Sequence, residues 1–168
     1  GRYSWYHNSV LSFISSTIFS AYNSLPTIMP TILTDLPTST LTSQPTIPLE
    51  IIPTNLRPDI TLIWHHKKQI TIIELSILFE TSIYERHTNK HNKYSPLVTD
   101  LESRGWETTL LCFEVGSRGL ITSQNSKTFL QMFPHTMPKR QANAHLRKAY
   151  EVSVTSSFHI CTGLVPRR

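Results

Sequence analysis

The chain has few cysteines, few glycines and few charged residues for a length of 168 residues. Its two cysteines, Cys112 and Cys161, lie far apart without the spacing of a metal site or a disulfide scaffold, which favours an intracellular protein over a secreted one. Charged residues make up only 16% of the chain and hydrophobic residues 39%, so we expect part of it to be poorly ordered. No apolar run is long enough to span a bilayer, and we expect no membrane association.

Acidic residues are also scarce. The 16 lysines and arginines outnumber the 11 aspartates and glutamates, which gives a net charge of +5, with eight histidines besides. A basic balance favours an anionic partner, most often nucleic acid, and the alternative is a basic protein without such a partner. The length suits a single domain over residues 1–168, and the chain begins with Gly rather than Met, so we expect a fragment or a processed piece.

The spacing of apolar residues predicts both helices and strands. Helices are expected at residues 3–22, 80–104, 127–132 and 139–150. Strands are expected at residues 59–64, 69–78 and 106–115, with a further short strand at residues 49–52. This order predicts an α/β protein with a mixed central sheet flanked by helices.

Prolines divide the chain unevenly. Seven of the eleven fall between Pro26 and Pro58, among serines and threonines, which is typical of a loop or insert; we place it at residues 24–56. Pro96 falls inside the second predicted helix, where it can end one helix at Tyr94 and let Ser95 cap another. At the other end, residues 138–168 are expected to form a basic helix and tail.

Two carboxylates stand in the β-rich segment. Asp59 begins the first predicted strand and Glu74 lies within the second, among isoleucines. If the two strands pair, both carboxylates can converge at one end of the sheet and bind Mg²⁺ or Mn²⁺, which take one or two protein carboxylates and offset the cost of burying them. The alternative is that Asp59 caps a turn and Glu74 pairs with a lysine on an exposed face of the sheet.

Two lysines follow on the second predicted helix. Lys90 shares a helical stripe with Tyr94, Leu97 and Leu101, so it points toward the apolar face, and Lys93 lies beside it. A lysine on a buried stripe favours an anionic partner, and the alternative is that its ammonium group reaches solvent along the stripe.

Five short motifs follow one another along the chain: RYSWYHNSVL, RPD, ELS, KHNKY and EVGSRG, at residues 2–11, 57–59, 74–76, 90–94 and 114–119. The series resembles the PD-(D/E)XK nuclease superfamily, in particular the restriction-like endonuclease domain of site-specific non-LTR retrotransposons and related retroelement-derived proteins. Most of that superfamily has a lysine where this chain has Ser76, whereas the retroelement branch has it on the following helix. Tyr6 stands where the family's first helix has a basic residue.

The resemblance implies a restriction-endonuclease-like αβββαβ core and a metal-dependent endonuclease that hydrolyses DNA phosphodiester bonds. It implies that Asp59 and Glu74 bind Mg²⁺ or Mn²⁺ and that Lys90 or Lys93 acts on the phosphate or the attacking water. It also implies a nuclear location and partner domains of a retroelement polyprotein. The supporting residues that it suggests are His7, Asn8, Tyr94 and Glu80.

Each supporting residue has a structural alternative. His7 and Asn8 can cap or pack their helix, Tyr94 can be a core residue with a satisfied hydroxyl, and Glu80 can favour a helix start. The candidate nucleic-acid contacts are Arg118, Lys139, Arg140, Arg147 and Lys148. For these the alternatives are a turn residue and a solvated helix face.

A second hypothesis is a retroelement remnant that binds nucleic acid without cleaving it. Tyr6, Pro96 and the Pro/Thr-rich segment favour it, whereas the presence of Asp59, Glu74 and Lys90 favours the nuclease. A third hypothesis, in which the proline-rich segment is a docking module, has little support because that segment lacks a PxxP pattern with an arginine.

Overall fold

The computed structural model describes residues 2–25, 29–37, 46–78, 83–116 and 121–163. Its elements are, in order, α1 (Arg2–Asn23), β1 (Thr31–Thr34), β2 (Ile60–Trp64), a 3₁₀ turn η1 (His65–Lys67), β3 (Gln69–Leu78), α2 (Ile83–Ser103), β4 (Glu107–Gly116), α3 (Ser123–Leu130) and α4 (Lys139–Thr162). The predicted α/β class is confirmed, and the first six helices and strands follow the αβββαβ order. Two helices complete the chain.

The four strands form one mixed sheet in the order β1-β2-β3-β4. The first three strands are antiparallel neighbours, and β3 and β4 are parallel. The β2–β3 pair is a hairpin closed by η1, and both of its strands are rich in β-branched residues. The parallel pair needs a crossover connection, which α2 provides.

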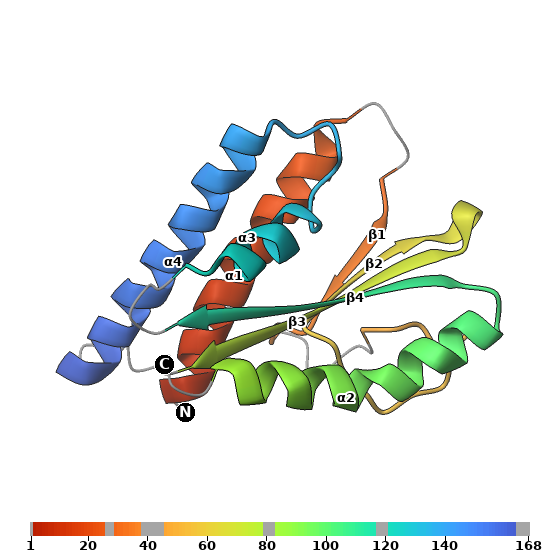
Figure 1. Cartoon of the computed structure of the whole chain (residues 1–168), viewed down its shortest axis with the longest axis horizontal. Coiled ribbons are helices and arrows are strands. Elements are labelled where there is room, and N and C mark those ends of the chain that lie inside the picture. The colour runs from red at the N-terminus through yellow and green to blue at the C-terminus, as the bar shows by residue number, and fades with distance from the viewer. Residues whose placement is uncertain (1, 26–28, 38–45, 79–82, 117–120, 164–168) are drawn as a thin grey trace.

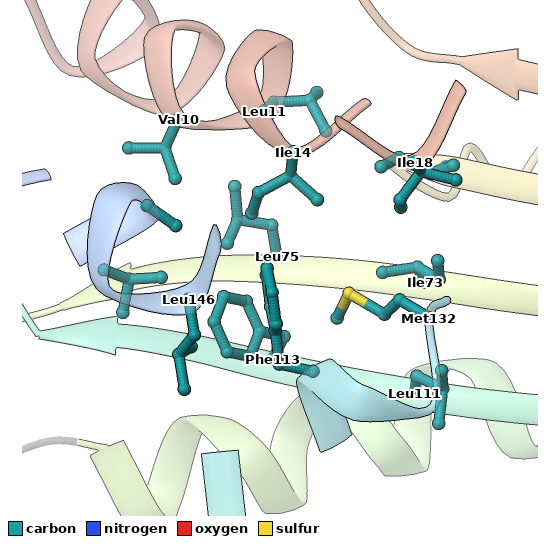
Figure 2. Close-up of a cluster of buried hydrophobic side chains, with 14 of the residues drawn as sticks. Val10, Leu11, Ile14, Ile18, Ile73, Leu75, Leu111, Phe113, Met132 and Leu146 are labelled. Carbon is teal, nitrogen blue, oxygen red and sulfur yellow. The ribbon is translucent and has the colours of Figure 1, made fainter. Parts of the chain in front are cut away.

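Helices cover both faces of the sheet, α1, α3 and α4 one face and α2 the other (Figure 1). Alternate residues of each strand therefore enter two separate cores. Figure 2 shows the first core, where Leu11 and Ile14 of α1 meet Leu75 of β3 and Phe113 of β4. The second core places Ile70 and Ile72 of β3 and Ile63 of β2 under the apolar stripe of α2, which is Tyr94, Leu97 and Leu101.

Helix α2 is continuous through Pro96, so the expectation of two helices separated there is wrong. Ser95 does not cap a new helix, since its hydroxyl donates to the carbonyl of His91 at 2.9 Å within the same helix. Proline has no amide to donate the helical hydrogen bond at this position. Packing of Tyr94, Leu97 and Leu101 in the second core compensates for that loss and keeps the helix continuous.

The proline-rich segment is less irregular than its composition predicts. It contains β1, and Ile47, Ile51 and Ile52 are buried in the second core. The short strand predicted at residues 49–52 is wrong, because this stretch is a turn in which the amide of Ile51 donates to the carbonyl of Pro48 at 3.0 Å. The last helix is longer than predicted, because it ends at Thr162 and not at Tyr150.

Candidate active site

Asp59 and Glu74 lie on the same face of the sheet. In the antiparallel β2–β3 pair Ile60 is opposite Ile73, and extending that register by one residue places Asp59 opposite Glu74. Directly opposed residues have Cβ atoms about 5 Å apart. Glu74 contacts α2 through Lys90, Asp59 contacts His7 of α1, and the two carboxylate residues are only 3% and 8% exposed. The two carboxylates therefore lie opposite each other on neighbouring strands, largely buried.

Asp59 is fixed from two directions. Its Oδ2 accepts a hydrogen bond of 2.6 Å from the amide of Leu75, the residue after Glu74. Its Oδ1 lies 3.4 Å from Nε2 of His7, which α1 brings to the start of β2. Burial lowers the pKa of His7, but the hydrogen bond and negative charge of Asp59 outweigh it, with smaller help from Asn8, and the pKa is raised overall. His7 therefore contacts Asp59 directly, and Asn8 contacts His7.

Glu74 contacts the ammonium group of Lys90 through Oε1, in an ion pair between β3 and α2. Its other oxygen, Oε2, is buried with no hydrogen-bond partner in the described part of the chain. Burial raises the pKa of Glu74 and the charge of Asp59 raises it further, while Lys90 acts in the opposite direction. A carboxylate that is buried and close to a second carboxylate is stabilised in its charged form by a nearby cation.

Lys93 and Lys90 occupy different positions around the two carboxylates. The Nζ of Lys93 lies 3.2 Å from the hydroxyl of Tyr94 and 4.7 Å from the centre of its ring. Tyr94 is fully buried, and its hydroxyl donates to the carbonyl of Arg57 at 3.1 Å. Burial raises the pKa of Tyr94, and the charges of Glu74 and Asp59 raise it further. Of the two lysines, Lys90 is therefore the one that contacts a carboxylate.

Thr61 adds a second unpaired polar atom to this face. It lies two residues after Asp59, is fully buried, and its hydroxyl has no hydrogen-bond partner among the residues described. Its place in the register is diagonal to Glu74. The unpaired Oε2 of Glu74 and hydroxyl of Thr61, together with the carboxylate of Asp59, are a suitable setting for a hydrated divalent cation or an ordered water.

No group of three or more His, Cys, Asp or Glu residues suited to a metal ion occurs in the described ranges. Mg²⁺ needs only one or two protein carboxylates, because it keeps several of its waters. The pair Asp59 and Glu74 fits that donor set, and the unpaired Oε2 of Glu74 gives an available ligand atom.

The predicted nucleic-acid contacts on the last helix lie away from this pair. Lys139, Arg140, Arg147 and Lys148 are exposed on α4, which packs on the opposite face of the sheet from α2 (Figure 1). Lys148 also pairs with Glu151 at 2.8 Å. Glu80 and Arg118, named from the sequence, lie outside the described residues.

Sequence reasoning did not identify Asp35 or Thr61 as site residues, and it quoted Arg57 only as part of a motif. Arg57 forms an ion pair with Asp35, and the amide of Asp35 donates to the carbonyl of Asp59 at 2.9 Å. No local signal indicates Asp35, because it follows the short strand β1 that the sequence pattern also missed.

Comparison with known proteins gives no family for this chain. No family model matches the sequence, and no significant match is found among curated proteins. In the part of the chain that the structure describes, none of the helices combines the length and the apolar character needed to cross a membrane.

Proposed function

We propose that this chain is a metal-dependent endonuclease domain that hydrolyses DNA phosphodiester bonds. The observation that supports it most directly is the arrangement of two carboxylates and one ammonium group. Asp59 and Glu74 come from neighbouring strands onto one face, and Lys90 reaches Glu74 from the helix that covers this face. These three residues belong to the RPD, ELS and KHNKY motifs, whose resemblance to a retroelement endonuclease supports the same function.

Asp59 and Glu74 would hold Mg²⁺ or Mn²⁺, which supplies a Lewis acid and a water of lowered pKa. Lys90 is close enough to the carboxylates to stabilise the negative charge that develops on a phosphate held beside them. His7 and the amide of Leu75 keep the carboxylate of Asp59 oriented. The ammonium group of Lys93 contacts the hydroxyl of Tyr94 instead, which gives Lys93 an assisting position.

A plasmid nicking assay tests the proposal. The purified chain with Mg²⁺ or Mn²⁺ should convert supercoiled plasmid to the nicked form, and Asp59→Asn and Glu74→Gln should each lower the rate at least about a hundredfold. Asp100→Asn is the matched control, because Asp100 is an exposed carboxylate on α2. Equal rates for the wild type and Asp59→Asn would mean that the nicking belongs to a contaminant.

The second candidate is a DNA-binding remnant without cleavage. It is favoured by one observation, that Lys90 already neutralises a carboxylate that is almost completely buried. Calorimetric titration with Mn²⁺ separates the two candidates. Uptake of one ion that depends on Asp59 supports the nuclease, and salt-sensitive DNA binding without Mn²⁺ uptake supports the remnant. A nuclear location and further retroelement domains remain part of the nuclease proposal.

A further inference from the structure

Asp35 extends the row of carboxylates to a third strand. It follows β1 directly, and its amide donates to the carbonyl of Asp59, so β1 and β2 stay aligned up to this point. The charge of Asp35 also helps to raise the pKa of Tyr94. The three carboxylates therefore form a row across the same end of neighbouring strands: Asp35 after β1, Asp59 before β2 and Glu74 in β3.

Arg57 pairs with Asp35 at the exposed margin of this row. The two side chains are 40% and 31% exposed, whereas the side chain of Glu74 is 3% exposed. The backbone of Arg57 is held in place, since its carbonyl accepts the hydrogen bond from Tyr94. The guanidinium group thus stands two residues from Asp59, anchored at its base and accessible to solvent at its end.

The chemistry of this pair suits exchange with a phosphate. A guanidinium group has five N–H donors in a planar fork, and it binds phosphate oxygens in the same bidentate manner as a carboxylate. A half-exposed ion pair contributes little to stability because solvent screens it, so that an incoming anion can replace Asp35 at small cost. DNA brought to a row of carboxylates also needs a cation at the point of entry.

We propose that Arg57 binds a backbone phosphate of the DNA beside the two metal-binding carboxylates, and that Asp35 competes with this phosphate for the guanidinium group. The inference rests on the proposed function, and it adds the residue that positions the substrate strand and the residue that limits its affinity. Asp35 acts only through Arg57. Removing the charge of Asp35 therefore strengthens DNA binding only while Arg57 is present.

Fluorescence anisotropy with a labelled DNA duplex, in EDTA and at several salt concentrations, tests this inference without cleavage. Asp35→Asn should tighten binding about two- to fivefold, which is the range of an exposed ion pair. Arg57→Gln should weaken binding several-fold and reduce the slope of log affinity against log salt by about one. The double variant should bind as Arg57→Gln does.

A matched pair on the same layer provides the control. Arg104 and Asp100 form another exposed Arg–Asp pair, at the far end of α2 from Lys90. Asp100→Asn and Arg104→Gln change the net charge as the test variants do, and each should leave affinity and salt slope nearly unchanged. Thermal melting checks that each variant folds, and Asp35→Ser replaces Asp35→Asn if the latter does not.

Three results would overturn the inference. They are equal effects of Asp35→Asn and Asp100→Asn, a gain from Asp35→Asn that persists without Arg57, and an unchanged salt slope in Arg57→Gln. Its failure is distinguishable from failure of the nuclease proposal. If the chain nicks plasmid with metal but DNA binding does not depend on Arg57, only the role of Arg57 is wrong. If DNA binding depends on Arg57 but the chain does not nick plasmid, only the proposed nuclease activity is wrong.

Discussion

The ammonium group of Lys90 and the carboxylate of Glu74 form an ion pair between a helix and the strand before it, across 16 positions of sequence. Of the two lysines of KHNKY, Lys90 contacts the carboxylate of Glu74 and Lys93 contacts the hydroxyl of Tyr94. We expect Lys90→Ala to lower the metal-dependent nicking rate about a hundredfold or more, as loss of a charge-stabilising donor does elsewhere. Lys93→Ala should cost less than about tenfold, since Lys93 contacts Tyr94 instead. The reverse order in the plasmid assay would assign the catalytic role to Lys93.

His7 should make stability depend on pH. Its pKa in the folded chain is raised from 6.5, so its protonated form is favoured by folding. The stability that it contributes is fully present below pH 6.5 and is lost as the pH rises through the folded pKa. The difference in unfolding free energy between the wild type and His7→Gln should therefore be largest under mildly acidic conditions and shrink above neutrality. Urea unfolding across pH 5–9 measures it.

His66→Gln is the control for this titration, because His66 is exposed in the turn between β2 and β3. Its unfolding free energy should follow that of the wild type across the pH range. A constant difference between the wild type and His7→Gln would show that Asp59 does not hold the proton on His7.

Thr61→Val tests whether the buried hydroxyl is unsatisfied. Its Oγ1 has no hydrogen-bond partner in the described residues, and valine has nearly the same shape. Replacing an unpaired buried hydroxyl by a methyl group should leave the unfolding free energy unchanged or raise it by about 1 kcal/mol. Thr61→Ser keeps the hydroxyl and should be less stable than either. A loss of more than about 1 kcal/mol in Thr61→Val would mean that an ordered water or ion bonds to the hydroxyl.

Pro96→Ala should stabilise the chain. Pro96 lies inside the continuous helix α2, where proline removes one backbone hydrogen bond and crowds the preceding turn. Alanine should raise the unfolding free energy by about 1–3 kcal/mol. Thr99→Ala, at an exposed site one turn later, should give less than about 1 kcal/mol, because the gain in helix propensity is offset by loss of the hydrogen bond of 3.2 Å from its hydroxyl to the carbonyl of Ser95. An equal gain from both variants would show that the helix has already relaxed around Pro96.

Periodicity along the chain predicted the parts of the fold that are specified locally. Strands β2, β3 and β4 are β-branched and apolar, and the helical stripe that contains Lys90 and Tyr94 indicated the buried side of α2. The period of two along β3 placed Glu74 with Ile70 and Ile72. The two isoleucines lie in the second core under α2, and Lys90 of α2 contacts Glu74, which confirms the shared face. These predictions succeed because each depends on neighbours within one element.

The features that the sequence did not reveal depend on pairing between distant segments. Strand β1 has four residues in a proline-rich stretch, and it is a strand because Ile32 and Leu33 pair with β2. The contact between Asp35 and Arg57 follows from that register. The continuity of α2 at Pro96 likewise depends on the core beneath it. Local composition cannot specify any of the three, since each is decided by tertiary packing.

The contact between α1 and α4 has a consequence for shortened forms of the chain. The hydroxyl groups of Tyr6 and Ser153 form a hydrogen bond of 2.7 Å across 147 positions, so the last helix is attached directly to the first. Asp59, Glu74 and Lys90 all lie within the central 36 residues from 59 to 94. A truncation before Lys139 would keep these three groups but remove the α4 side chains that pack against α1, and it would weaken the support that His7 gives Asp59. Loss of the C-terminal helix would therefore act on the carboxylates through the N-terminal one.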